Sequence, residues 1–91
     1  MKILILGAGK MGAFFVDLLS FDHETAVMDI VPHRLRFMYN TLRFTSYDEI
    51  DDFAPELVIN AVTLKATKQI FSDVIPHLPK DCILADIASV K

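Results

Sequence analysis

All three glycines of this 91-residue chain stand in one short run, Gly7-Ala8-Gly9-Lys10-Met11-Gly12. Their spacing is G-x-G-x-x-G. An aliphatic run from Ile3 to Leu6 precedes the glycines, and an amphipathic segment follows them. Glycine is favoured where the backbone turns sharply or where another group must approach it closely. This placement therefore predicts a tight turn from a buried strand into a helix.

The spacing gives each glycine a separate role. Gly7 permits the turn out of the strand, Gly9 leaves the backbone accessible to a diphosphate, and Gly12 lets the helix lie close to the sheet. The free N–H groups and the dipole of the helix would favour an anion at its start. We therefore expect a dinucleotide to bind at Gly7, Ala8, Gly9, Lys10, Met11 and Gly12. The alternative is a plain tight turn without a ligand.

The rest of the chain alternates between aliphatic runs and amphipathic segments. We expect strands at residues 3–6, 25–30, 43–45, 57–62 and 82–85. Four helices are expected between them. The first would bury the face formed by Met11, Phe14, Phe15, Leu18 and Leu19, and the second would run from Pro32 through Leu42. A brief helix would follow the capping-box sequence 46–49, and the last would contain residues 70–78. Strands that are apolar throughout and separated by helices indicate a parallel sheet.

These elements predict an α/β fold, a three-layer Rossmann-type parallel sheet with strand order 3-2-1-4-5, truncated after the fifth strand. Residues 1–91 would form one NAD(P)-binding domain, the N-terminal part of a larger two-domain enzyme. A ligand would lie beyond the carboxyl ends of the first and fourth strands, where the winding of the sheet reverses.

Asp29 follows the second strand, where an acid commonly accepts hydrogen bonds from the adenosine ribose hydroxyls. Its charge would repel a 2′-phosphate, which favours NAD over NADP. Arg34 is close enough in sequence to reach such a phosphate, so NADP stays possible, although a solvated helix position is its simpler interpretation. Val62 and Thr63 follow the fourth strand and would border the ribose and nicotinamide. Thr63 could also cap the next helix.

Composition excludes several other classes of function. The net charge is −3 and no basic stripe is interleaved with aromatic residues, so no nucleic-acid partner is expected. No apolar run reaches the ~18 residues of a membrane span, and the run at the N-terminus is too short for a signal peptide. We therefore expect a cytoplasmic protein. Cys82 stands alone and is expected to be buried, and the histidine spacing predicts no metal site.

Two motifs resemble a known family. The G-x-G-x-M-G form of the glycine loop resembles the 6-phosphogluconate and β-hydroxyacid dehydrogenase superfamily and also the prephenate dehydrogenases. The ending Asp86-Ile87-Ala88-Ser89-Val90-Lys91 is similar to the D-x-x-S-V-K signature of prephenate dehydrogenases. The resemblance covers all 91 residues and implies the cofactor-binding part of an enzyme that converts prephenate to 4-hydroxyphenylpyruvate, on the route to tyrosine.

By this resemblance Ser89 lies beside the nicotinamide and helps to orient a catalytic histidine, although a helix N-cap is its simpler interpretation. The family histidine lies in a later H-P-M-x-G segment, and the substrate-binding arginine lies later still. The chain alone would therefore bind cofactor weakly and catalyse nothing, and prephenate would bind only with that second part, in a homodimer. Ala88 departs from the family, which often has glycine there.

Two alternatives remain open from the sequence. One is the cofactor domain of a β-hydroxyacid dehydrogenase, in which a lysine of a later helix would be catalytic. The other is a regulatory module that senses NAD(H) without catalysis, against which the D-x-x-S-V-K ending argues.

Overall fold

A computed structural model describes residues 1–29, 31–36, 38–39, 41–62 and 64–87, without the side chain of residue 64. Its sheet contains the strands β1 (Lys2–Leu6), β2 (Glu24–Met28), β3 (Leu42–Phe44), β4 (Leu57–Asn60) and β5 (Ile83–Asp86). All neighbouring strands are parallel and their order is β3-β2-β1-β4-β5, which confirms the predicted topology.

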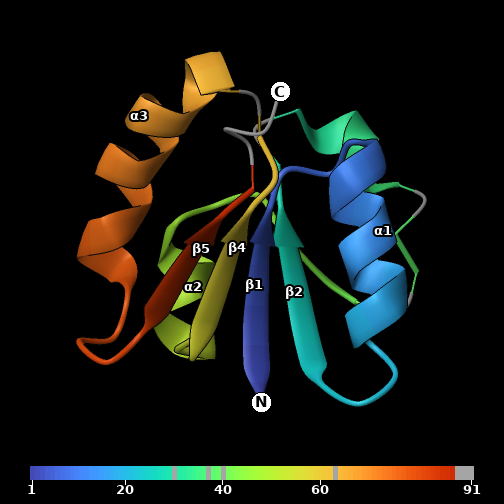
Figure 1. Cartoon of the computed structure of the whole chain (residues 1–91), viewed down its shortest axis with the longest axis horizontal. Helices are drawn as coiled ribbons and strands as arrows, with labels where there is room; N and C mark the ends of the chain where they lie inside the picture. The colour runs from blue at the N-terminus through green and yellow to red at the C-terminus, as the bar shows by residue number, and fades with distance from the viewer. Residues whose placement is uncertain (30, 37, 40, 63, 88–91) are drawn as a thin grey trace.

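Helices cover both faces of the sheet (Figure 1). One face packs against α1 (Lys10–Leu19) and the short 3-10 helix η1 (Pro32–Leu35), and the other packs against α2 (Asp48–Phe53) and α3 (Leu64–Val74), which continues into the 3-10 turn η2 (Ile75–His77). A hydrophobic core lies on each face of the sheet, and alternate residues of β1 contribute to the two cores. Ile3 and Ile5 pack in the core beside α1, and Leu4 and Leu6 pack in the core beside α2 and α3. Burial on both faces explains why this strand is aliphatic throughout.

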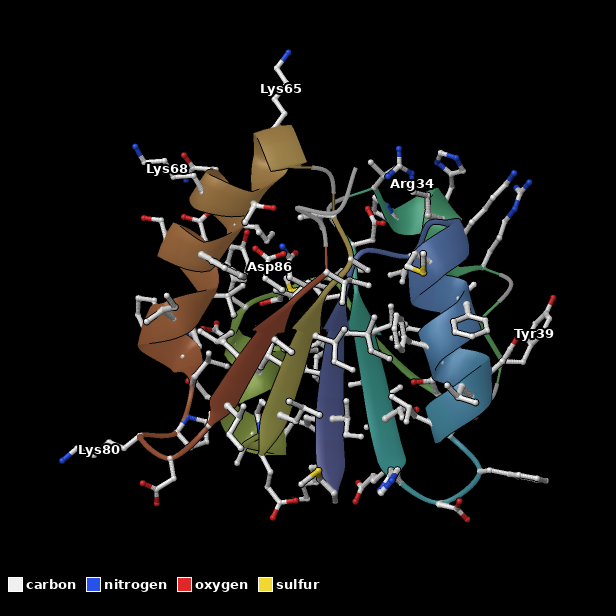
Figure 2. The ribbon with its side chains drawn as sticks, viewed as in Figure 1. Arg34, Tyr39, Lys65, Lys68, Lys80 and Asp86 are labelled. Atoms are coloured by element: carbon white, nitrogen blue, oxygen red, sulfur yellow. The ribbon has the colours of Figure 1, made fainter. Side chains whose placement is uncertain are left out.

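The carboxyl ends of the strands meet at one edge of the molecule (Figure 1). The first turns of α1 and α3 lie at this edge. Figure 2 shows the side chains of Arg34 and Asp86 there as well, whereas Lys80 lies at the opposite edge. This arrangement brings together the segments that follow β1, β2 and β4, as the predicted topology requires.

The helix predicted from Pro32 through Leu42 is wrong in its extent. Among the described residues of this segment (32–36, 38–39 and 41–42), only those of η1 are helical, and Leu42 belongs to β3, where it pairs with Ala26 of β2. Leu35 and Met38 are nevertheless buried in the core beside α1. Leu42 instead pairs with a strand that lies distant in the sequence, and this long-range pairing is not recorded in the helical spacing of the apolar residues.

The buried face predicted for α1 is also partly wrong. Phe15 and Leu19 pack against the core, but Met11, Phe14 and Leu18 are exposed. The residues of α1 that are buried are Gly12 and Val16. The absence of a side chain at Gly12 brings that row of the helix closest to the sheet, which rotates the larger apolar side chains outward.

A short helix does form at the capping-box sequence 46–49, as predicted, and it begins within that sequence. The Glu49 carboxylate accepts hydrogen bonds from the N–H groups of Thr45 and Ser46, at 2.9 and 3.1 Å. The hydroxyl of Ser46 accepts from the N–H of Asp48 at 3.3 Å, one residue earlier than in a standard capping box. The helix therefore begins at Asp48 with its first amides partly satisfied by side chains.

The prediction that Cys82 is buried is wrong, because its side chain is only half-buried. It precedes β5, an edge strand whose Ile83 and Leu84 are exposed. Partial burial still raises the pKa of the Cys82 thiol, which keeps it protonated at neutral pH.

Candidate functional site

Gly7 connects β1 to the loop in a conformation that other residues rarely adopt. Its φ is +100°, and its N–H donates a hydrogen bond of 2.7 Å to the carbonyl of Met28. A Cβ at this position would lie 3.0 Å from Cγ1 of Val62 and 3.1 Å from the carbonyl group of Ala61. Both the backbone angle and the limited space therefore require glycine, as expected for a tight turn out of the strand.

Gly9 is the N-cap residue of α1 and faces open space. It is exposed, and a Cβ built on it would meet nothing within 4 Å. Its φ of −76° and ψ of −164° are accessible to any residue. Gly9 offers no side chain to cap the helix, and the N–H groups of the first helical turn, from Lys10 onward, have no acceptor within the helix. The start of α1 is therefore an open group of amide donors.

Gly12 permits the closest approach in the loop. A Cβ at Gly12 would lie 1.8 Å from the carbonyl oxygen of Gly7, which no side chain could tolerate. The absence of a side chain thus sets the distance between the first turn of α1 and the end of β1. This agrees with the predicted role of Gly12 in packing the helix on the sheet.

Asp29 is buried, and its carboxylate connects the glycine loop to the segment that follows β2. Its Oδ2 accepts a hydrogen bond from the N–H of Ala8, and its Oδ1 accepts one from the N–H of Val31, both at 2.8 Å. The guanidinium of Arg34 lies 3.7 Å from Oδ2. The N–H of Ala8 is thus directed at Asp29 rather than at the open mouth of the helix. A carboxylate has about four acceptor positions, so Asp29 can still accept from a ligand.

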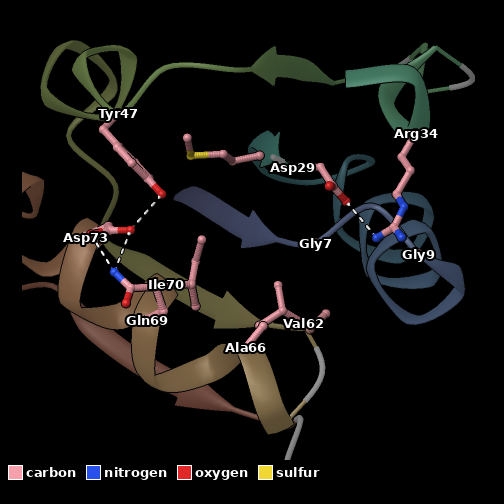
Figure 3. Close-up of a pocket in the computed structure, with 12 residues that line it drawn as sticks. Gly7, Gly9, Asp29, Arg34, Tyr47, Val62, Ala66, Gln69, Ile70 and Asp73 are labelled. Atoms are coloured by element: carbon pink, nitrogen blue, oxygen red, sulfur yellow. Dashed lines mark hydrogen bonds and ion pairs between the residues drawn. The ribbon is translucent and has the colours of Figure 1, made fainter. Parts of the chain in front are cut away.

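A pocket of about 370 Å³ runs along this edge of the sheet. Figure 3 shows Gly7, Gly9, Asp29 and Arg34 at one end and Tyr47, Gln69 and Asp73 at the other. The remaining lining residues are Met28, Ala61, Val62, Ala66 and Ile70. The volume is within the range of small-molecule sites, and an apolar lining with a few polar groups at its ends is typical of them.

The structure brings Val62 into this pocket, beside the glycine loop. Lys10 and Met11 are exposed in the first turn of α1, next to the pocket's glycine end. Two predicted site residues, Thr63 and Ser89, lie outside the described residues.

Asn60, the last residue of β4, was not among the predicted site residues. It is fully buried, and its Nδ2 donates hydrogen bonds to Thr67 of α3 at 2.9 Å and to Asp86 of β5 at 3.0 Å. Its Oδ1 accepts from the N–H of Val62 at 3.3 Å. Asn60 thereby fixes the loop between β4 and α3. A polar residue ending an aliphatic run was the available signal, since a buried amide needs partners.

We expect replacement of Asn60 by alanine to lower the free energy of unfolding by about 2–3 kcal/mol, because it leaves buried polar groups without their partner. Urea denaturation followed by circular dichroism would measure the loss. Thr67→Val removes only one of the three contacts and should cost less than half as much. Equal losses in the two variants would show that the network does not centre on Asn60.

The structure also gathers three possible metal ligands that the sequence spacing did not reveal. Ligand atoms of Asp48, Asp51 and His77 lie within 4.8 Å of one another. The Nδ1 of His77 is 3.0 Å from the carboxylate of Asp51, and its ring stacks on Tyr47. Both carboxylates are exposed. The hydrogen bond to Asp51 and the ring contact account for the position of His77 without an ion.

Among the described residues, no helix has both the length and the apolar character that a membrane crossing would need.

The chain matches no model of a known protein family. Its structure is similar to a prephenate dehydrogenase from A. aeolicus in complex with hydroxyphenyl propionate and NAD+, with a TM-score of 0.87 and 26% identity over the whole chain. It also resembles an arogenate dehydrogenase from Synechocystis (TM-score 0.81, 21% identity, whole chain) and a (S)-3-hydroxybutyryl-CoA dehydrogenase from Ralstonia eutropha (TM-score 0.81, 18% identity, 93% of the chain).

The chain spans only 34%, 34% and 40% of the length of these three proteins. The sheet order, the covering helices and the glycine turn agree with this likeness. The chain therefore has the Rossmann-type fold of these dehydrogenases.

Proposed function

We propose that this chain is the nicotinamide-dinucleotide-binding domain of a dehydrogenase, with NAD as the preferred cofactor. The observation that carries the proposal is the open start of α1 at Gly9, directly beside the buried carboxylate of Asp29. Amides at a helix N-terminus suit a diphosphate, and a carboxylate at the end of the neighbouring strand suits two ribose hydroxyls.

Different residues of the site would contact different parts of the cofactor. The amides at Gly9, Lys10, Met11 and Gly12 would receive the pyrophosphate, and Gly7 and Ala8 would hold the loop in position. Asp29 would accept hydrogen bonds from the adenosine ribose, while Val62 and Thr63 would border the cofactor beyond β4. The nicotinamide supplies the hydride acceptor when it is bound. The described residues bind and orient the dinucleotide.

Asp29 also explains the expected preference for NAD. Its buried negative charge would lie close to the 2′-phosphate of NADP, and Arg34 is already paired with that charge. A second anion would therefore have to compete with Asp29 for the guanidinium. Repulsion in a partly buried site is stronger than in water, so NADP should bind more weakly.

We expect Asp29→Asn to weaken NAD binding about tenfold and to raise the affinity for NADP relative to NAD. Asparagine is chosen because it keeps the size of the side chain and one acceptor oxygen, which can accept from one of the amides of Ala8 and Val31, whereas alanine would leave both without an acceptor. Isothermal titration calorimetry with each cofactor would measure the ratio. A ratio that does not change would place the ribose away from Asp29.

The substrate of the complete enzyme is proposed to be prephenate, oxidised and decarboxylated to 4-hydroxyphenylpyruvate in tyrosine biosynthesis. Support comes from the structural likeness to a prephenate dehydrogenase and from the D-x-x-S-V-K ending. Ser89 would then lie beside the nicotinamide, and a second domain would supply the remaining catalytic groups and a homodimer interface. The arogenate dehydrogenase likeness leaves arogenate as a related substrate.

Assays of the polypeptide that contains this chain would test the substrate. Prephenate-dependent formation of NADH is the expected result. Oxidation of a β-hydroxyacid instead would support the second candidate, which the likeness to a hydroxybutyryl-CoA dehydrogenase favours. NAD binding without either activity would indicate a sensing module.

A further inference from the structure

The end of the pocket farthest from the glycine loop carries a polar cluster that the proposed diphosphate and ribose contacts do not use. It consists of Tyr47, from the segment before α2, and Gln69 and Asp73, from α3 (Figure 3). The Tyr47 hydroxyl donates to Oδ2 of Asp73 at 3.2 Å, and Nε2 of Gln69 lies 3.1 and 3.2 Å from the two carboxylate oxygens. Two segments distant in sequence thus meet around one carboxylate.

Two contacts fix the orientation of the Tyr47 side chain, one through its ring and one through its hydroxyl group. Its ring stacks on His77, with centroids 5.8 Å apart and planes inclined by 20°. Burial, followed by the charge of Asp73 and the hydrogen bond to it, raises the pKa of Tyr47. The phenol therefore stays protonated throughout the neutral range, with its proton directed at Asp73 and its oxygen still able to accept.

The cluster consequently offers a ligand mainly acceptors. The hydroxyl proton of Tyr47 and one N–H of Gln69 are directed at Asp73, and the second N–H of Gln69 remains a donor beside these acceptors. A carboxylate has only acceptor sites, about four of them, and three contacts leave it with spare capacity. A ligand group that faces Tyr47 and Asp73 should therefore be a hydrogen-bond donor rather than a carbonyl or an anion.

Between the two ends of the pocket the lining is apolar. Met28, Val62, Ala66 and Ile70 contribute to it. Such a slot accommodates a flat aromatic ring, whose faces need no hydrogen bonds. With a diphosphate at Gly9 and a ribose at Asp29, the base attached to that ribose would enter the slot with its edge directed at the cluster.

We propose that Tyr47 and Asp73 read the base of the cofactor by accepting a hydrogen bond from the 6-amino group of adenine. This inference rests on the proposed function and deepens it, because it assigns residues that select the base. Hypoxanthine differs at this edge in two places: it has an N1–H where adenine has a lone pair, and a carbonyl oxygen where adenine has the amino group. That oxygen would face the lone pairs of Tyr47 and the charge of Asp73.

Calorimetric titration of the whole chain with NAD+ and with nicotinamide hypoxanthine dinucleotide tests the proposal directly. We expect the hypoxanthine analogue to bind at least about tenfold more weakly, because a hydrogen bond to a charged group is replaced by a repulsion. Equal binding of the two dinucleotides would overturn the base assignment and leave the proposed function standing. Failure of both to bind would overturn the proposed function and this inference together.

Two variants of the cluster and one control variant would show which residues cause the difference in affinity between the two dinucleotides. Asp73→Asn should bring the two affinities within about threefold, because the amide can donate to the hypoxanthine carbonyl. Tyr47→Phe keeps the ring and removes the hydroxyl, and it should reduce the discrimination severalfold. Asp52→Asn removes the same charge from an exposed position of α2 outside this pocket and should leave the ratio unchanged. An unchanged ratio in both Asp73→Asn and Tyr47→Phe would contradict the proposal.

Discussion

Replacing Gly9 with valine is expected to weaken NAD binding at least about a hundredfold while leaving the fold intact. The backbone of Gly9 has ordinary angles, and the space beside it is empty of protein, so the new side chain causes no strain. The same space is where the diphosphate would approach the amides of α1. Hydrogen bonds from those amides to a charged group contribute roughly 1.5–3 kcal/mol each, so losing even two of them accounts for the expected effect.

Calorimetry with NAD+ measures the loss, and circular dichroism checks that the variant folds. Gly9→Ala should give an intermediate affinity, because its methyl group fills less of the space. Asp17→Val adds a similar side chain to an exposed position later in the same helix and should bind NAD+ like the unmodified chain. Unchanged affinity in Gly9→Val would remove the pyrophosphate from the start of α1.

Replacing Gly12 with alanine should have the largest effect on stability. A single methyl group would lie 1.8 Å from the carbonyl oxygen of Gly7, so either the helix or the end of β1 must move. Overpacking that displaces backbone costs about 3 kcal/mol or more. For a domain of this size we expect the melting temperature to fall by more than about 10 °C.

Gly9→Ala is the matched control for Gly12→Ala, because the same change is made three residues earlier in the loop. Its methyl group meets no protein atom within 4 Å, so the melting temperature should stay within a few degrees of that of the unmodified chain. Similar melting temperatures for the two variants would contradict the close approach of α1 to β1 at Gly12.

Local sequence patterns were sufficient to predict the architecture. The aliphatic runs gave the strands of the parallel sheet, and the glycine spacing predicted the turn into α1. These predictions succeeded because a strand buried on both faces and a glycine at positive φ depend on neighbours in the sequence. Errors arose where a longer-range contact competes with a local one, as at Leu42, which joins β3 rather than a helix.

The face that α1 buries shows the same limit. Spacing alone favoured the row that contains Met11, Phe14 and Leu18, since these side chains are large and apolar. The structure instead buries Gly12 and Val16. The reason is the close approach of Gly12 to the carbonyl of Gly7, a contact whose distance no hydrophobic pattern records.

The sequence by itself determined the order of strands and helices, the sharp turn at Gly7 and the proposed position of the diphosphate, because each depends on a few adjacent residues. The tertiary structure alone decided which polar side chains meet. Asn60 reaches Asp86, and Tyr47 reaches Asp73, each across 26 positions of the chain. Such pairs form only when parallel strands and their helices bring distant segments to one edge, and no local periodicity encodes that meeting.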